Sequence, residues 1–180
     1  MKVAVLDIET SDLDLDIGSI LEIGICLLDS KTGKTSKLFD SLVNDHFNPD
    51  KEKQAWIFSN STLRPEMIIN APSLESKRTE IQAILSRYPV IAYNSSFDLD
   101  YLRSRRFEIP KELDDPMLIC RDILRIPHHY FGWKYPKVQE AMEYFEIDGI
   151  EPHRAFEDSK FEAMIVFNLF KHGFYQESGK

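Results

Sequence analysis

The sequence has few cysteines, no long apolar run and no surplus of positive charge. Its two cysteines, Cys26 and Cys120, both lie in apolar segments, so we expect buried thiols rather than a disulfide or a metal-binding pair. The longest apolar runs fall far short of the roughly 18 residues that a membrane span needs. We therefore expect a cytoplasmic protein with no signal peptide, no transmembrane helix and no membrane partner.

The formal net charge of −8 at pH 7 argues against a broad surface for binding polyanions. Small basic clusters nevertheless remain at residues 31–37, at residues 103–106 and across the stretch PHHYFGWKYPK. Each cluster is either a solvated face or a local contact for phosphate, and the sequence leaves both interpretations open.

The chain also lacks internal repeats, low-complexity tracts and Gly/Ser linkers. Its 180 residues are 43% apolar and 12% aromatic, which is enough material for one hydrophobic core. We predict a single domain over residues 1–175 and a short C-terminal tail at residues 176–180.

Hydrophobic patterning predicts three strands, then helices that alternate with short strands. The expected elements are strands at 2–9, 19–29 and 36–43, a polar loop NDHFNPDKEK, a helix capped by Ser73, a strand at PVIAY, a helix over FDLDYLRSRR, a strand at MLIC and a helix over 155–172. This order favours an α/β fold in which helices cover both faces of a mixed sheet.

Two carboxylates end the first predicted strand, VAVLDIE. Residues two apart in a strand share a face, so Asp7 and Glu9 point the same way, opposite to Leu6 and Ile8. If the strand is central, this pair needs a cation, and because no Lys or Arg lies in the strand core, a metal ion is the natural partner. The alternative is that the strand ends at Asp7 and both carboxylates face water.

The next acids, in DLDLDIGSILE, nearly match an EF-hand loop. The glycine falls at the seventh position instead of the sixth, Glu22 falls at the eleventh instead of the twelfth, and strands flank the segment where helices are needed. We therefore expect Asp12, Asp14 and Asp16 to belong to a solvated connection between strands.

Two further acids and one histidine lie far along the chain. Asp98 follows the PVIAY strand, where it is either a helix-capping or first-turn acid or a third acid at the edge of a neighbouring strand. In the last helix, Asp158 shares a stripe with Ala155 and Ile165 and so faces inward. His153 precedes Asp158 by five residues, at the helix entrance.

The segments DIET, YNSSFDLDYL and HRAFED resemble the three motifs of the DEDDh family, the DnaQ-like 3′ to 5′ exonucleases. The resemblance spans residues 2 to about 172. It implies the ribonuclease H-like fold, with a five-stranded mixed β-sheet flanked by helices on both faces. It also implies a single exonuclease domain that shortens single-stranded nucleic acid from the 3′ end and releases nucleoside 5′-monophosphates. The motifs do not separate DNA from RNA, and of the two we expect DNA.

The resemblance further implies the role of each residue in the site. Four carboxylates would hold two divalent metal ions, Mg²⁺ or Mn²⁺, which prefer oxygen ligands. Asp7 would bridge both ions, Glu9 and Asp158 would bind the water-activating ion, and Asp98 would serve the second ion. His153 would act as the general base, because an unperturbed imidazole has a pKa of about 6.5.

Substrate contacts are also implied, at Thr10, Leu13, Asn94 and Phe97. Leu13 would form an apolar wedge against the terminal base, whereas Phe97 is equally suited to core packing. The implied partners are a 3′ end and a DNA polymerase or a replication or repair complex. A noncatalytic accessory module is the alternative class of function.

Three positions depart from the family pattern. Asp12 replaces a usual glycine, Tyr93 replaces a histidine that commonly precedes the residue at Asn94, and the stretch WIFSNST replaces an IHGIT-like segment. None of these changes removes an expected metal ligand, so their effect falls on the shape of the nucleotide pocket.

Overall fold

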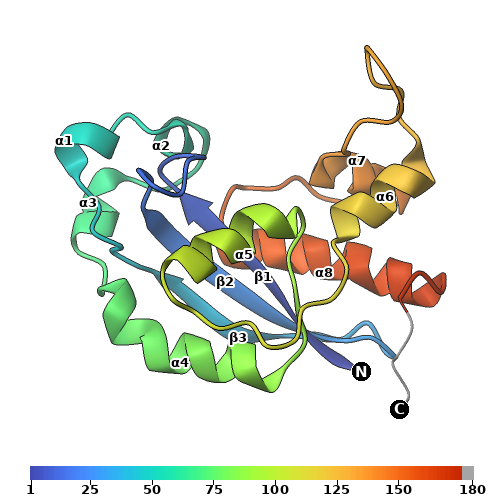
Figure 1. Ribbon diagram of the computed structural model, residues 1–180, viewed down its shortest axis with the longest axis horizontal. Coiled ribbons are helices and arrows are strands. Elements are labelled where there is room, and N and C mark those ends of the chain that lie inside the picture. Colours follow the sequence, from blue (N-terminus) through green and yellow to red (C-terminus); the bar gives the residue numbers. More distant parts are fainter. Residues whose placement is uncertain (176–180) are drawn as a thin grey trace.

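A computed structural model describes residues 1–175, and the predicted tail at 176–180 lies outside the described part (Figure 1). The centre of the fold is a sheet with strand order β3-β2-β1-β4. The first three strands form an antiparallel meander, and β4 pairs in parallel with β1. The strands are β1 (Lys2–Thr10), β2 (Ile20–Asp29), β3 (Thr35–Leu42) and β4 (Val90–Ile91).

The expectation of five strands is wrong for the described residues, which form four. Beside β4, where a fifth strand would lie, Val90 makes a single parallel bridge with Glu112. The Val90 N–H donates to the Lys111 carbonyl at 2.8 Å, and the Leu113 N–H donates to the Val90 carbonyl at 3.0 Å. Prolines at positions 110 and 116 flank this segment and carry no N–H, which limits the ladder to these two bonds.

The predicted short strand at MLIC is also wrong, because these residues lie in helix α6 (Pro116–Leu124). Asp115 caps this helix by accepting a hydrogen bond from the Met117 N–H at 2.8 Å, and Pro116 occupies the first turn. A run of four apolar residues is compatible with either a strand or a helix, so the Asp-Pro pair before it was the more informative signal.

The other predicted helices appear in the predicted order, and the structure adds three short helices between β3 and α4 and the helix α7 before α8. Ser73 caps α4 as predicted, because its hydroxyl accepts from the Ser76 N–H at 3.2 Å. The expected polar loop contains α1, which Asn48 caps. These helices are α1 (Pro49–Glu52), α2 (Trp56–Asn60), α3 (Pro65–Ile69), α4 (Leu74–Arg87), α5 (Ser95–Ser104), α7 (Val138–Tyr144) and α8 (Ala155–Lys171).

Helices cover both faces of the sheet, as Figure 1 shows. Side chains of Ala4, Leu6 and Ile8 pack with α4 and α5 in one buried cluster. Val3 and Val5 point to the opposite face and pack with α6, α7 and α8 in a second cluster. Within residues 1–175, no helix has the length and apolar character that a membrane crossing requires.

Candidate active site

The carboxylates of β1 point toward α8. Because side chains alternate along a strand, Asp7 and Glu9 continue the row of Val3 and Val5, whose cluster includes residues of α8. The strand does not end at Asp7, since it runs on to Thr10 with β2 alongside. Two acids therefore lie on the face of the central strand β1 that α8 covers.

Asp98 is tied directly to the same strand. It lies in the first turn of α5, is 4% exposed, and accepts a hydrogen bond from the Ile8 N–H at 3.0 Å through Oδ1. The parallel pairing of β1 with β4 ends at Val5 and Ile91, so the Ile8 N–H lies beyond the end of β4 and Asp98 supplies its acceptor. The residue at the helix-capping position is Asn94, so the capping alternative for Asp98 does not hold.

A glycine in β2 lets α8 approach the sheet closely. Gly24 lies opposite Asp7, and a Cβ at Gly24 would lie 2.2 Å from the Ala155 carbonyl carbon and 2.2 Å from the Phe156 nitrogen. Any side chain at this position would push the first turn of α8 outward. The close approach brings Asp158, which is 3% exposed, to the face of β1 that carries the two acids.

The start of α8 is held by an ion pair. Glu22 lies opposite Glu9, is 1% exposed, and contacts Arg154 through Nη2 at 2.6 Å and Nε at 3.0 Å. The same carboxylate accepts from the Ala155 N–H at 3.0 Å, and Arg154 reaches Thr62 at 3.0 Å. This pair fixes the helix entrance that carries the histidine.

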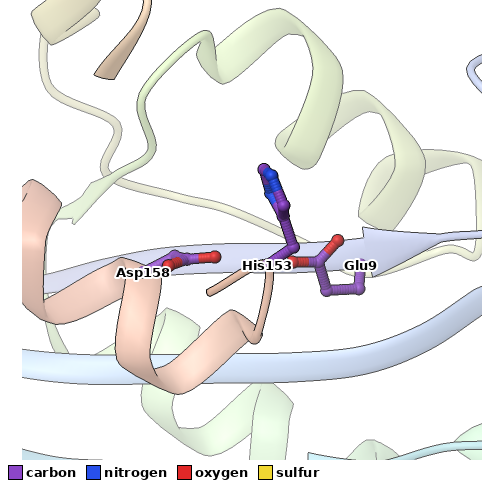
Figure 2. A group of neighbouring side chains, drawn as sticks. All are labelled: Glu9, His153 and Asp158. Atoms are coloured by element: carbon purple, nitrogen blue, oxygen red, sulfur yellow. The ribbon is translucent and has the colours of Figure 1, made fainter. Parts of the chain in front are cut away.

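Three predicted residues converge at this entrance. Glu9, His153 and Asp158 each offer a ligand atom, and these atoms lie within 4.8 Å of one another (Figure 2). Glu9 comes from β1, Asp158 from the first turn of α8, and His153 from the segment just before it. Asp7 and Asp98 join this group through β1, so all five predicted residues belong to one neighbourhood.

The group fits a divalent cation. Among residues 1–175, three buried carboxylate oxygens have no hydrogen-bond partner: Asp7 Oδ2, Asp158 Oδ1 and Glu162 Oε2. A buried anionic oxygen without a partner is costly, and hard cations such as Mg²⁺ and Mn²⁺ bind such oxygens. The residues that would hold metal ions are therefore oxygen donors of the right kind.

Burial, together with the charges of neighbouring acids, raises the pKa values of the four carboxylates. Burial, followed by the charges of Glu162 and Asp98, raises the pKa of Asp7 well above its usual range. Burial and the neighbouring Asp158 raise the pKa of Glu9 to about 9. Burial likewise raises the pKa of Asp98 to about 8 and that of Asp158 to about 7. Burial is the main cause of these shifts and the neighbouring negative charges add to it, so a bound cation would favour the charged carboxylates.

Glu162, Glu151 and Glu22 are acids of this region to which the sequence analysis gave no role. Glu162 is 2% exposed and lies one turn after Asp158 on the predicted inward stripe, so its spacing was a usable signal. Burial raises the pKa of Glu151 to about 7. The sequence carries no signal for Glu22, because its position opposite Glu9 depends on the register of β1 and β2.

His153 is held in an unusual backbone conformation beside an aromatic ring. Its φ is 53°, in the left-handed region that few residues other than glycine adopt. Its ring meets the Trp56 ring edge-on, with 5.0 Å between centroids and 74° between planes. Burial lowers the pKa of His153, so the neutral imidazole is favoured.

The predicted substrate contacts differ in exposure. Leu13 is 84% exposed and therefore open to a ligand, and Thr10 is half-buried, with its hydroxyl donating to the Asp12 carbonyl at 2.8 Å. Phe97 is partly buried against the core, and its ring centroid lies 5.2 Å from that of Tyr101. Asn94 is half-buried and adopts a left-handed conformation with φ 64°.

Two of the three aspartates after β1, Asp12 and Asp14, cap local turns. The Asp12 carboxylate accepts from the Asp14 N–H at 3.0 Å, and the Asp14 carboxylate accepts from the Asp16 N–H at 2.9 Å. All three are exposed, as a solvated connection requires. A cleft of about 1270 Å³ lies beside this connection and is lined by none of the five predicted catalytic residues.

The chain matches the family RNase_T, described as Exonuclease, over residues 4–166. A DNA polymerase III of the PolC type from Caldanaerobacter subterraneus subsp. tengcongensis is 26% identical over 167 residues, which are 93% of this chain and 11% of that protein. The 3′-5′ exonuclease DinG of Staphylococcus epidermidis is 24% identical over 174 residues, 93% of this chain and 18% of DinG. The chain thus spans less than a fifth of either relative.

Solved structures share the fold. The nuclease domain of 3′hExo, a DEDDh family member bound to rAMP, has a TM-score of 0.72 at 15% identity and covers 96% of this chain and 92% of that chain. S. pombe Pop2p in its Mg²⁺- and Mn²⁺-bound form has a TM-score of 0.72 at 16% identity and covers 96% of this chain and 84% of that chain. The family model covers most of the chain, so the predicted exonuclease family is confirmed and the chain belongs to the RNase_T exonuclease family.

Proposed function

We propose that this protein is a metal-dependent 3′ to 5′ exonuclease that acts on single-stranded nucleic acid, DNA in preference to RNA, and releases nucleoside 5′-monophosphates. The observation that carries the proposal is the convergence of Glu9, His153 and Asp158 within 4.8 Å, beside carboxylate oxygens of Asp7 and Asp158 that lack partners. The preference for DNA rests on the similarity to a DNA polymerase of the PolC type.

The carboxylates would hold two divalent ions. Asp7 would serve both ions, Glu9 and Asp158 would hold the water-activating ion, and Asp98 would hold the second ion. When bound, two such ions supply the positive charge that activates an attacking water and stabilises the leaving oxygen. The unpartnered oxygens of Asp7 and Asp158 support this assignment.

His153 would take the proton from the attacking water. Because burial lowers its pKa, the imidazole is neutral near pH 7 and can accept a proton there. The water oxygen then forms the new bond to phosphorus, the bond from phosphorus to the 3′ oxygen breaks, and that oxygen leaves with a proton from solvent. Thr10, Leu13, Asn94 and Phe97 would position the terminal nucleotide.

The substrate is best tested by parallel digestion of single-stranded DNA, single-stranded RNA of the same sequence and a duplex with a 3′ mismatch, each labelled at its 5′ end. A ladder that shortens from the 3′ end, fastest on single-stranded DNA, is expected with Mg²⁺ or Mn²⁺. Equal or faster digestion of RNA would contradict the DNA preference. Inactivity on all three substrates with both metals would favour a noncatalytic module that binds a polymerase or repair complex.

A further inference from the structure

Residues 126–135, between α6 and α7, form a protruding hairpin that we call the aromatic hairpin. The His128 N–H donates to the Gly132 carbonyl at 3.0 Å, and the Lys134 N–H donates to the Ile126 carbonyl at 2.9 Å. Gly132 has a φ of +66° at the turn. In Figure 1 the hairpin rises above α6 and α7, on the same side of the molecule as the arrowhead of β1.

Four aromatic rings of this hairpin face solvent. Phe131 is 92% exposed, Tyr130 83%, Tyr135 56% and Trp133 46%. None of them belongs to the hydrophobic clusters formed by residues 1–175. A group of large rings held outward on a hydrogen-bonded turn is unusual on a monomer surface and marks a binding surface.

The segment that carries these rings has a positive balance of charge although the chain as a whole is acidic. Residues 121–140 include Arg121, Arg125, Lys134 and Lys137 against Asp122 and Glu140, which pair with Arg121 and Lys134. Arg121 lies over the Tyr135 ring, with its guanidinium carbon 5.5 Å from the ring centroid. Aromatic faces beside cationic side chains suit a ligand that has both flat rings and negative charge.

The base of the hairpin is anchored beside the candidate active site. The Tyr93 hydroxyl donates to the Pro136 carbonyl at 2.9 Å, and this bond is buried. In the parallel pairing of β1 with β4, Val5 lies opposite Ile91, so Tyr93 stands level with Asp7. The hairpin therefore begins close to the sheet position that carries the carboxylates and extends away from it into solvent.

We propose that the aromatic hairpin stacks on bases of a single-stranded nucleic acid, on the 5′ side of the nucleotide that enters the active site. The inference rests on the proposed function, because it takes the strand already bound by its 3′ end as the ligand. The hairpin would hold successive bases without reading their sequence, since every base offers a flat face.

The test compares a long with a minimal substrate. The double variant Tyr130→Ala/Phe131→Ala changes only exposed rings, and Tyr144→Ala, 54% exposed on α7, is the matched control outside the hairpin. With Mn²⁺, the double variant is expected to lower kcat/KM about tenfold on a long oligothymidylate, the size of effect that losing one stacked base produces. Turnover of the p-nitrophenyl ester of thymidine 5′-monophosphate, which has no upstream bases, is expected to stay at the wild-type value.

Equal losses on both substrates, or no loss on the oligothymidylate, would overturn the inference. Absence of turnover of both substrates by the wild-type protein would instead refute the proposed function. In that case, fluorescence anisotropy of the labelled oligothymidylate still tests the hairpin, because weaker binding by the double variant than by Tyr144→Ala is expected. Identical binding by both variants would contradict a role for the hairpin in nucleic-acid binding and leave a protein partner as its ligand.

Discussion

The ring of Trp56 stands edge-on to the imidazole of His153, with 5.0 Å between their centroids. Trp56 opens α2, in the stretch WIFSNST that departs from the family pattern, and it is 61% exposed. Burial lowers the pKa of His153, and the indole is one of the groups that shield the imidazole from water. We therefore expect Trp56, a residue outside the family motifs, to affect the pKa of the proposed general base.

Replacing Trp56 with alanine is expected to raise the pKa of His153. Hydration of the imidazole favours its charged form, so the pKa moves up toward the unperturbed value of about 6.5. The acidic limb of the pH profile of kcat/KM shifts to higher pH in parallel, while activity at alkaline pH changes little. An NMR titration of His153 in the metal-free protein measures the pKa without turnover. Trp56→Phe keeps a ring at this position and serves as the control, and an identical profile for Trp56→Ala would contradict the assignment.

Glu22→Gln is expected to destabilise the protein by about 2 kcal/mol, because the carboxylate is buried and its loss removes charged hydrogen bonds to Arg154 and to the Ala155 N–H. The partly exposed guanidinium of Arg154 keeps the loss below that of a fully buried pair. Urea unfolding measures the change. Glu75→Gln breaks an exposed pair with Arg78 and is expected to change stability by less than about 1 kcal/mol. Similar losses in both variants would contradict the stabilising role of the Glu22–Arg154 ion pair at the start of α8.

Gly24→Ala is expected to displace α8 from β2. The new Cβ would meet backbone atoms of Ala155 and Phe156, which cannot rotate away, so we expect a loss of about 3 kcal/mol and of metal-dependent activity. Gly173→Ala is the comparison, since Gly173 has a φ of +79° and open space around it. Only backbone strain of about 1 kcal/mol is expected there, with activity retained. Thermal unfolding and activity measurements on the two variants distinguish a steric clash with α8 from backbone strain alone. Full activity of Gly24→Ala would contradict the inference that Gly24 allows α8 to approach β2.

The metal-free protein is expected to lose stability as the pH rises from about 5 to about 9. Burial and mutual repulsion raise the folded-state pKa of Glu9 to about 9, of Asp98 to about 8 and of Asp158 to about 7, all above their usual values near 4. Protonation therefore stabilises the folded state, and this contribution is complete below about pH 4 and disappears as the pH passes the raised values.

Added Mn²⁺ is expected to remove most of this loss, because the cation replaces the protons as counter-charge. Melting curves between pH 5 and pH 9, with and without Mn²⁺, provide the measurement. Asp7→Asn should raise the melting temperature of the metal-free protein at high pH, whereas the exposed Asp148→Asn should not. A melting temperature that Mn²⁺ leaves unchanged at every pH would contradict the carboxylate cluster.

Spacing within single elements predicted much of this arrangement. Asp7 and Glu9 share a face because strands repeat every two residues, and Asp158 faces inward because of its place on the helical stripe. The Ser73 cap of α4 likewise followed from local hydrogen bonding. These features depend on neighbours in the chain, which a sequence displays directly.

One local signal was misinterpreted, and features that depend on contacts between elements were missed. The strand assigned to MLIC is a helix, because its Asp115 and Pro116 start signal outweighs a short apolar run. The ion pair of Glu22 with Arg154 joins residues far apart in the chain, and so does the close approach of Gly24 to Ala155. Such pairings depend on strand register and helix placement, neither of which a local pattern contains.

We propose that Asp7 is a metal ligand of an exonuclease site. The most direct test follows the length of a 5′-labelled single-stranded DNA during incubation with the wild-type protein and with Asp7→Asn, each with Mn²⁺ and with EDTA. Stepwise shortening from the 3′ end, with release of nucleoside 5′-monophosphates, is expected only for the wild-type protein with Mn²⁺. Shortening of the same DNA at an equal rate by Asp7→Asn, or by the wild-type protein in EDTA, would contradict it.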